Sequence, residues 1–92
     1  YIKSIPAEIS KLTNLRCLDM ESNQIKSLPE TLAQLSHLDE LYLENNQLNS
    51  IPSVIFKLTN LTCLELTSNQ IHEIPSDIYQ LKKTRMAWFR RQ

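Results

Sequence analysis

Two histidines and two cysteines are the side chains of this chain that could most readily act as bases, nucleophiles or metal ligands. Paired imidazoles can transfer protons or share a metal ion, and a thiolate can attack an electrophile. No C-x-x-C motif occurs, and the absence of glycine rules out a glycine-rich phosphate-binding loop. The chemistry that remains possible depends on where the fold places His37, His72, Cys17 and Cys63.

An internal repeat predicts the elements that position these side chains. The segments MESNQIKSLP (20–29), LENNQLNSIP (43–52) and LTSNQIHEIP (66–75) recur every 23 residues. Within one unit, Leu41 and Leu43 have the two-residue spacing of one face of a strand. The next apolar residues, Ile55, Leu58 and Leu61, have the three-residue spacing of a tight helical turn. Each unit is therefore predicted to contain one strand and one short helical segment.

A proline occupies the same position in every unit: Pro6, Pro29, Pro52 and Pro75. This residue suits the first turn of a short helix, where its missing N–H is not needed. It also requires an extended residue before it. One strand and one α- or 3₁₀-helical segment would then form each coil of a solenoid, with neighbouring strands parallel and about 4.8 Å apart.

The pattern L-x-x-L-x-L-x-x-N-x-[IL]-x-x-[IL]-P-x-x-[IL]-x-x-L resembles the leucine-rich repeat family over essentially the whole chain. The resemblance implies an α/β fold: a right-handed superhelical solenoid with parallel strands on the concave face. Short helical or 3₁₀ segments would form the convex face. The 23-residue length and the IP or LP step are most similar to the intracellular class found in Ras-pathway scaffolds.

The repeat predicts a single domain over 1–92, built of about four 23-residue units and cut from a longer array. Its expected divisions are 1–14 (partial), 15–37, 38–60, 61–83 and 84–92 (partial and degenerate). In the last unit, a constant 23-residue period places Thr84, Ala87 and Phe89 at the strand leucine positions. The outward residues of a fourth strand would then be Met86, Trp88 and Arg90. The same tail could instead lead into another domain or contact a membrane.

An asparagine at one position of each unit is predicted to point inward: Asn23, Asn46 and Asn69. Its amide can satisfy buried backbone groups at the bend after each strand, each of which would otherwise cost about 1–3 kcal/mol. Asparagine also tolerates the left-handed backbone conformation that tight turns need. The preceding residue, Asn45 in the middle unit, is expected to face water.

On this scaffold the candidate chemical residues separate. His37 precedes the second strand and His72 follows the third, so they cannot form an acid–base pair or share a metal. Cys17 and Cys63 lie two coils apart, about 9–10 Å, which is too far for a disulfide. We therefore predict no catalytic residues, no metal and no cofactor. Free thiols favour a reducing compartment, so the predicted location is cytoplasmic, or a host cytoplasm if the chain is a bacterial effector.

The outward strand residues are the predicted partner-binding residues: Asp19, Glu21, Glu40, Tyr42, Glu44, Glu65, Thr67 and Trp88. Five of them are acids and none is a base. One interpretation is an acidic surface with Tyr42 as the aromatic anchor for a basic partner. The other is that these polar residues only keep the sheet soluble. On the convex side, Val54 is expected to be exposed, and Phe56 and Tyr79 to stack into an apolar patch.

The overall charge is balanced, with ten Lys and Arg against ten Asp and Glu, so nucleic acid and membrane partners are not predicted. The predicted function is a non-catalytic protein–protein interaction module. One alternative is the recognition segment of a larger multidomain enzyme, such as a kinase, GTPase or ubiquitin ligase, whose catalytic part lies elsewhere. Another is a structural repeat that self-associates through uncapped ends.

Overall fold

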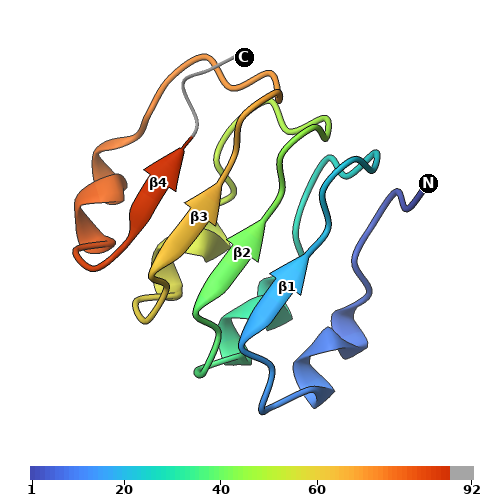
Figure 1. The fold of residues 1–92 in the computed structure, drawn as a ribbon, viewed down its shortest axis with the longest axis vertical. Coiled ribbons are helices and arrows are strands. Elements are labelled where there is room, and N and C mark those ends of the chain that lie inside the picture. The colour runs from blue at the N-terminus through green and yellow to red at the C-terminus, as the bar shows by residue number, and fades with distance from the viewer. Residues whose placement is uncertain (88–92) are drawn as a thin grey trace.

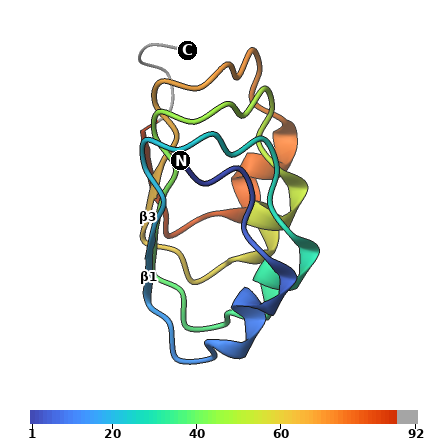
Figure 2. The ribbon, with the colours of Figure 1, turned by 90° about the vertical axis from the view of Figure 1, so that its right-hand side faces the viewer.

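The computed structural model describes residues 1–87 and contains a 3₁₀ helix and a strand in each repeat. In chain order the elements are η1 (Ala7–Lys11), β1 (Cys17–Asp19), η2 (Glu30–Gln34), β2 (Glu40–Tyr42), η3 (Ser53–Lys57), β3 (Cys63–Glu65), η4 (Ser76–Gln80) and β4 (Arg85–Ala87). The strands form one parallel sheet in the order β1-β2-β3-β4 (Figure 1). The 3₁₀ helices lie on the opposite side of the coil (Figure 2). The predicted solenoid is confirmed.

Each 3₁₀ helix begins directly after a proline of the repeat. The prolines are the N-cap residues of these helices. They therefore lie one position before the first helical turn, whereas the sequence pattern predicts them within that turn. The carbonyl of Pro52 accepts a hydrogen bond from the N–H of Ile55 at 3.1 Å, and the other three prolines make the same bond. Since proline fixes φ but keeps its carbonyl, it can start the helix without losing a backbone bond.

The core lies between the sheet and the helices and is formed by the repeated leucines and isoleucines. Leu41 and Leu43 have exposed fractions of 0%, which confirms that they point inward. Among the described residues, the exposed large apolar side chains all belong to the first and last coils: Tyr1, Ile2, Leu12, Ile74 and Tyr79. The repeated leucines and isoleucines of the middle coils are therefore buried in the core.

The register between strands changes at the last pair. Glu40 pairs with Cys17 and with Cys63, an offset of 23 residues on both sides, whereas Cys63 pairs with Arg85, an offset of 22. Thr84 still matches Leu61, because their N–H groups make equivalent bonds to Leu81 and Leu58. The residue that would match Thr62 is therefore missing, and the strand after it starts one residue early.

The predicted fourth strand is present as β4, but its predicted register is wrong. Met86 pairs with Leu64 and packs against the core, so it is an inward residue. Ala87 pairs with Glu65 on the outward side, not at a leucine position. Trp88, Phe89 and Arg90 lie outside the described residues. A single missing residue exchanges the two faces because side chains alternate along a strand.

The left-handed corner also differs from the prediction. Among residues 1–87, the residues with positive φ are Ser22, Asn45 and Ser68, at 57–59°. Each precedes an inward asparagine, so the buried amide and the left-handed backbone belong to neighbouring residues. In two of three corners the left-handed residue is a serine, which gains no steric relief from its side chain.

The predicted convex patch does not form. Val54 is 1% exposed and Phe56 is buried, so both belong to the core, contrary to the exposed position expected for Val54. Tyr79, which occupies in the next coil the position of Phe56, is 80% exposed. Val54 is buried because η3 is covered by a coil on each side, whereas η4 is covered by one among the described residues.

Candidate interaction surface

The inward asparagines form a ladder along the inside of the corner that follows the strands. The Oδ1 atom of Asn46 accepts the backbone N–H of Ile25 in the preceding coil at 3.0 Å. Its Nδ2 donates to the carbonyls of Leu43 and Glu44 in its own coil and of Met20 in the preceding coil, at 3.0–3.3 Å. Asn46 therefore connects two coils through groups that would otherwise be buried without partners.

Asn69 repeats this arrangement one coil further along. It accepts from Leu48 and donates to Leu43, Leu66 and Thr67. Asn46 and Asn69 are buried, whereas Asn23 is only partly buried and donates within its own coil. The inward orientation expected for these residues is seen in full for the two inner rungs.

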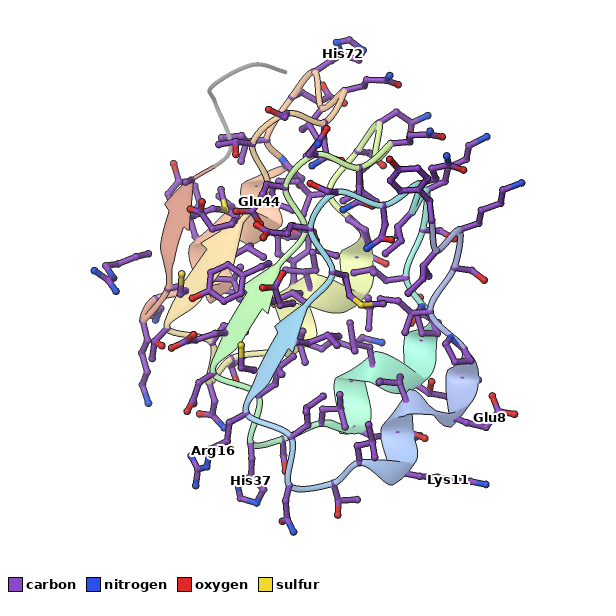
Figure 3. The ribbon with its side chains drawn as sticks, turned by 45° about the vertical axis from the view of Figure 1, so that its right-hand side comes forward. Glu8, Lys11, Arg16, His37, Glu44 and His72 are labelled. Atoms are coloured by element: carbon purple, nitrogen blue, oxygen red, sulfur yellow. The ribbon has the colours of Figure 1, made fainter. Side chains whose placement is uncertain are left out.

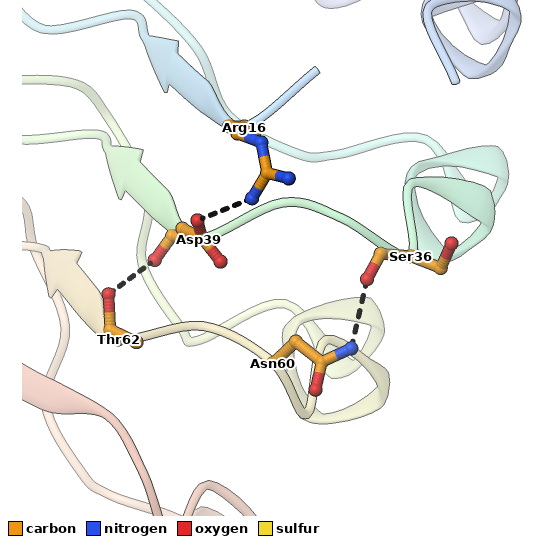
Figure 4. A network of polar contacts seen from close by, with 5 residues as sticks. All are labelled: Arg16, Ser36, Asp39, Asn60 and Thr62. Carbon is orange, nitrogen blue, oxygen red and sulfur yellow. Dashed lines mark hydrogen bonds and ion pairs between the residues drawn. The ribbon is translucent and has the colours of Figure 1, made fainter. Parts of the chain in front are cut away.

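Polar contacts also connect the coils at the opposite corner, before the strands (Figure 4). Arg16 forms an ion pair with Asp39 at 3.4 Å, and Thr62 Oγ1 donates to the carbonyl of Asp39 at 3.2 Å. The side-chain amide of Asn60, the first residue of an Asn-Leu-Thr sequence, donates to the carbonyl of Ser36 at 2.9 Å. These side chains are part of the scaffold.

The candidate chemical residues are separated, as their sequence positions require. His37 and His72 are exposed at opposite ends of the strands (Figure 3). Within residues 1–87, no group of three His, Cys, Asp or Glu side chains is arranged to hold a metal ion. No helix in this part of the chain is long and apolar enough to cross a membrane. The surface that remains is the outward side of the sheet.

We call this outward side the sheet face, and its side chains form three rows across the strands. The first row, set by the strand register, contains Cys17, Glu40, Cys63 and Arg85. The second row, set in the same way, contains Asp19, Tyr42, Glu65 and Ala87. The third row lies just beyond the strands and contains Glu21, Glu44 and Thr67. All the predicted partner-binding residues except Trp88, which lies outside the described residues, occur here. The sequence interpretation missed Arg85, because the constant period placed its neighbour Met86 on this face.

Glu44 has an unusual environment for a carboxylate. Its Oε1 atom is buried and has no hydrogen-bond partner among the described residues. Burial is the main cause that raises the pKa of Glu44, and the charges of Glu21, Glu65 and Asp19 raise it further, while the backbone N–H of Glu44 acts in the opposite direction. The sheet face therefore holds a partly desolvated carboxylate among like charges, and no base within residues 1–87 forms an ion pair with it (Figure 3).

Tyr42 lies at the centre of the sheet face and is partly exposed. Its hydroxyl donates a hydrogen bond of 2.7 Å to Glu40 Oε1. This bond is the main cause that raises the pKa of Tyr42, because the phenolate could not donate it. Glu40 thus fixes the orientation of the ring, which stays partly exposed.

Cys17 and Cys63 are free and flank Glu40 in the first row. Desolvation raises the pKa of Cys17, and Glu40 and Asp19 add to the shift. The thiol therefore stays protonated at neutral pH, which makes it a poor nucleophile. The geometry supports two unpaired thiols without an activating group beside Cys17.

A shallow depression lies on the sheet face between β3 and β4. It has a volume of about 250 Å³ and is lined by Cys63, Glu65, Arg85, Met86 and Ala87. The small side chains of Cys63 and Ala87 leave room beside Glu65 and Arg85. An acid, Glu65, and a base, Arg85, therefore border the same hollow.

A parallel sheet backed by one 3₁₀ helix per coil, with an inward asparagine at each corner, defines a leucine-rich repeat solenoid. The chain belongs to the leucine-rich repeat family: the model of the leucine-rich repeat region matches residues 1–86. A comparison with curated proteins found no match. The predicted 23-residue intracellular class is a finer assignment and stays a prediction.

Solved structures of three leucine-rich repeat proteins are among those similar to this chain. A leucine-rich repeat protein of Leptospira interrogans has a TM-score of 0.82 and 37% identity over 94% of this chain. An internalin from Listeria monocytogenes has a TM-score of 0.79 and 40% identity over 97%. The leucine-rich repeat ectodomain of the plant membrane receptor kinase GASSHO1/SCHENGEN3 from Arabidopsis thaliana has a TM-score of 0.79 and 32% identity over 94%.

The chain spans only a small part of each of these proteins: 22% of the Leptospira protein, 26% of the internalin and 11% of the plant ectodomain. The plant ectodomain was solved in complex with CASPARIAN STRIP INTEGRITY FACTOR 2. Domains with this fold are typically protein-interaction modules. The similarity therefore establishes the fold and the general type of module.

Proposed function

We propose that this chain is a non-catalytic interaction module whose sheet face binds a basic partner protein. The observation that carries the proposal is the buried, unpartnered Oε1 atom of Glu44 beside Glu21, Glu65 and Asp19. A lysine or arginine from a partner would pair with this carboxylate and neutralise the repulsion. A recognition segment within a larger enzyme would use the same surface.

Tyr42 supports the same role. A tyrosine held by Glu40 at the centre of a polar surface provides contact area with little loss of side-chain freedom on binding. Polar residues that only keep a sheet soluble do not require a buried carboxylate, and adjacent acids destabilise a sheet by roughly 0.2–1 kcal/mol. The arrangement is therefore better explained by binding than by solubility.

A pull-down with the wild type and two sheet-face variants tests this proposal. Tyr42→Ala and Glu44→Lys should each lose the retained protein, and retention by the wild type should decrease with rising salt. Tyr79→Ala and Glu73→Lys are the matched controls, because both residues are exposed away from the sheet face. Retention that survives both sheet-face changes, or that does not depend on salt, would refute an acidic binding surface.

We also propose a reducing compartment, the cytoplasm or the cytoplasm of a host, as the location of the module. The support is that Cys17 and Cys63 are free and lie two strands apart, both in register with Glu40. Mass measurement of the native protein after alkylation without reductant should find both thiols modified. A bridged or blocked thiol would argue against this location.

Self-association is a second candidate function, favoured by the exposed apolar residues of the two end coils. Leu12 and Ile2 are about half exposed, although their equivalents in the middle coils are core residues. A second copy stacked on this coil would cover them. Light scattering at two concentrations should show mass increasing with concentration, and Leu12→Lys should abolish the increase. A constant monomer mass would exclude this function.

A further inference from the structure

The shortened fourth repeat gives the sheet face a base at one corner. Arg85 continues the row of Cys17, Glu40 and Cys63 because one residue is missing after Thr84. Its side chain is exposed, and among residues 1–87 it forms no ion pair. Arg85 is therefore available to a ligand.

Two of the acids, Glu21 and Glu44, lie diagonally opposite this base, whereas Glu65 borders the same depression as Arg85. Glu21 and Glu44 lie in the third row, on the side of β1 and β2, whereas Arg85 lies in the first row on β4. Arg85 lies two strands away from Glu44 and two rows away along the strand direction, and two rows correspond to four residues. Strand and residue spacings of about 4.8 Å and 3.4 Å make this a separation of about 17 Å between backbone positions.

We propose that the sheet face binds an extended segment of a partner protein in one direction, with a basic side chain at Glu44 and an acidic one at Arg85. This inference rests on the proposed function and adds the chemistry and polarity of the partner. An extended chain covers about 3.3 Å per residue, so the two charged residues are separated by about five positions. A small apolar side chain between them fits the depression over Ala87 and Cys63.

Charge complementarity fixes the direction of the segment. Reversal would place the partner's acid beside Glu44, Glu21 and Asp19, and its base beside Arg85 and Glu65. The repulsion of the partner's acid at the Glu44 end therefore sets the direction. An entirely basic segment would satisfy Glu44 but would meet Arg85 at the other corner. The face thus discriminates between partners of the same net charge by the order of their charges.

Panning a phage-displayed library of random 12-residue peptides tests this inference without assuming a partner sequence. The wild type should select peptides with a base and an acid about four to six residues apart. Arg85→Glu should select peptides in which a base replaces the acid. Lys83→Glu makes the same charge change on the exposed turn before β4 and should select the wild-type pattern.

Fluorescence anisotropy then measures one selected peptide and its variant with glutamine in place of the acid. The substitution should weaken binding to the wild type about tenfold and should not weaken binding to Arg85→Glu. Selected peptides that are basic but carry no acid, and that bind in a Tyr42-dependent manner, would overturn the direction while leaving the proposed function intact. No enrichment of basic peptides by the wild type would overturn both.

Discussion

The asparagine ladder and the sheet face are both polar regions of the same coils, but they treat their polar groups differently. Each inner rung of the ladder has its amide oxygen and nitrogen bonded to the backbone of two coils. On the sheet face, Glu44 has a buried oxygen without a partner among the described residues. The two regions are only two residues apart in the sequence, at Glu44 and Asn46.

This difference distinguishes polar residues that stabilise the fold from those that are available for binding. A buried amide with all its partners lowers the free energy of the folded state, because the backbone groups it serves have no access to water. A buried carboxylate without a donor raises it. Substitutions in the two regions should therefore change stability in opposite directions, with the larger effect in the ladder.

The largest effect is expected for Asn46→Ala. The substitution leaves the buried N–H of Ile25 without its acceptor and removes donors to three carbonyls. At about 1–3 kcal/mol for each buried group left unpaired, the loss should reach roughly 3 kcal/mol. With a urea m-value of about 1.5 kcal/mol/M, the midpoint should fall by about 2 M.

The control for this substitution is Asn45→Gly. Asn45 has a φ of 59°, so alanine at this position would add a backbone penalty of about 1–2 kcal/mol, whereas glycine adds little. Its exposed amide makes one bond to Ser22 Oγ. The midpoint should change by less than a quarter as much as for Asn46→Ala, and equal changes would contradict the ladder.

An intermediate effect is expected at the left-handed corner between the two regions. Ser68 has a φ of 57° and lies between Thr67 of the sheet face and Asn69 of the ladder. Because asparagine tolerates this conformation better than serine, Ser68→Asn should stabilise the fold by about 0.5 kcal/mol. Thermal unfolding measures the change, with exposed Ser53→Asn as the control. A decrease in stability would show that the corner is not strained.

The repeat predicts the regular part of this structure well. At the positions of Leu41, Leu43 and Asn46, the same kind of residue recurs in the regular coils and has the same structural role. The register of β4 could not be predicted, since a missing residue leaves no mark when Met86 and Ala87 are both plausible inward residues. The prediction for Val54 failed for a different reason. Its position holds Asp77 in η4, which is exposed, and the apolar Val54 in η3, which is buried, so the repeat position alone does not fix burial there.

The positions of the candidate surface residues followed from alternation along the strands, but their environments did not. The sequence indicates five acids on one face, yet nothing in it distinguishes Glu44 from Glu21. Glu44 is partly buried with an unpartnered oxygen, whereas Glu21 is exposed. That difference arises because Glu44 has a neighbouring strand on each side, which depends on the packing of three coils.

The smallest expected effect, Glu44→Gln, tests the sheet face directly. Because burial and neighbouring acids raise the pKa of Glu44 in the folded state, its ionised form destabilises the fold at neutral pH. Stability should rise as the pH falls through the folded-state pKa towards the ordinary value of 4.5. The glutamine variant lacks this dependence, so its advantage at pH 7, a few tenths of a kcal/mol, should disappear near pH 4.

Urea unfolding of both proteins at pH 7 and pH 4 measures this advantage, with Glu21→Gln as the exposed control. The substitution should also weaken binding of a basic partner, because glutamine offers no charge to a lysine or arginine. Opposite signs for stability and binding at one residue are the signature of a group retained for recognition. A glutamine variant that is less stable and also binds more weakly would show that Glu44 is a structural residue, like the asparagines of the ladder.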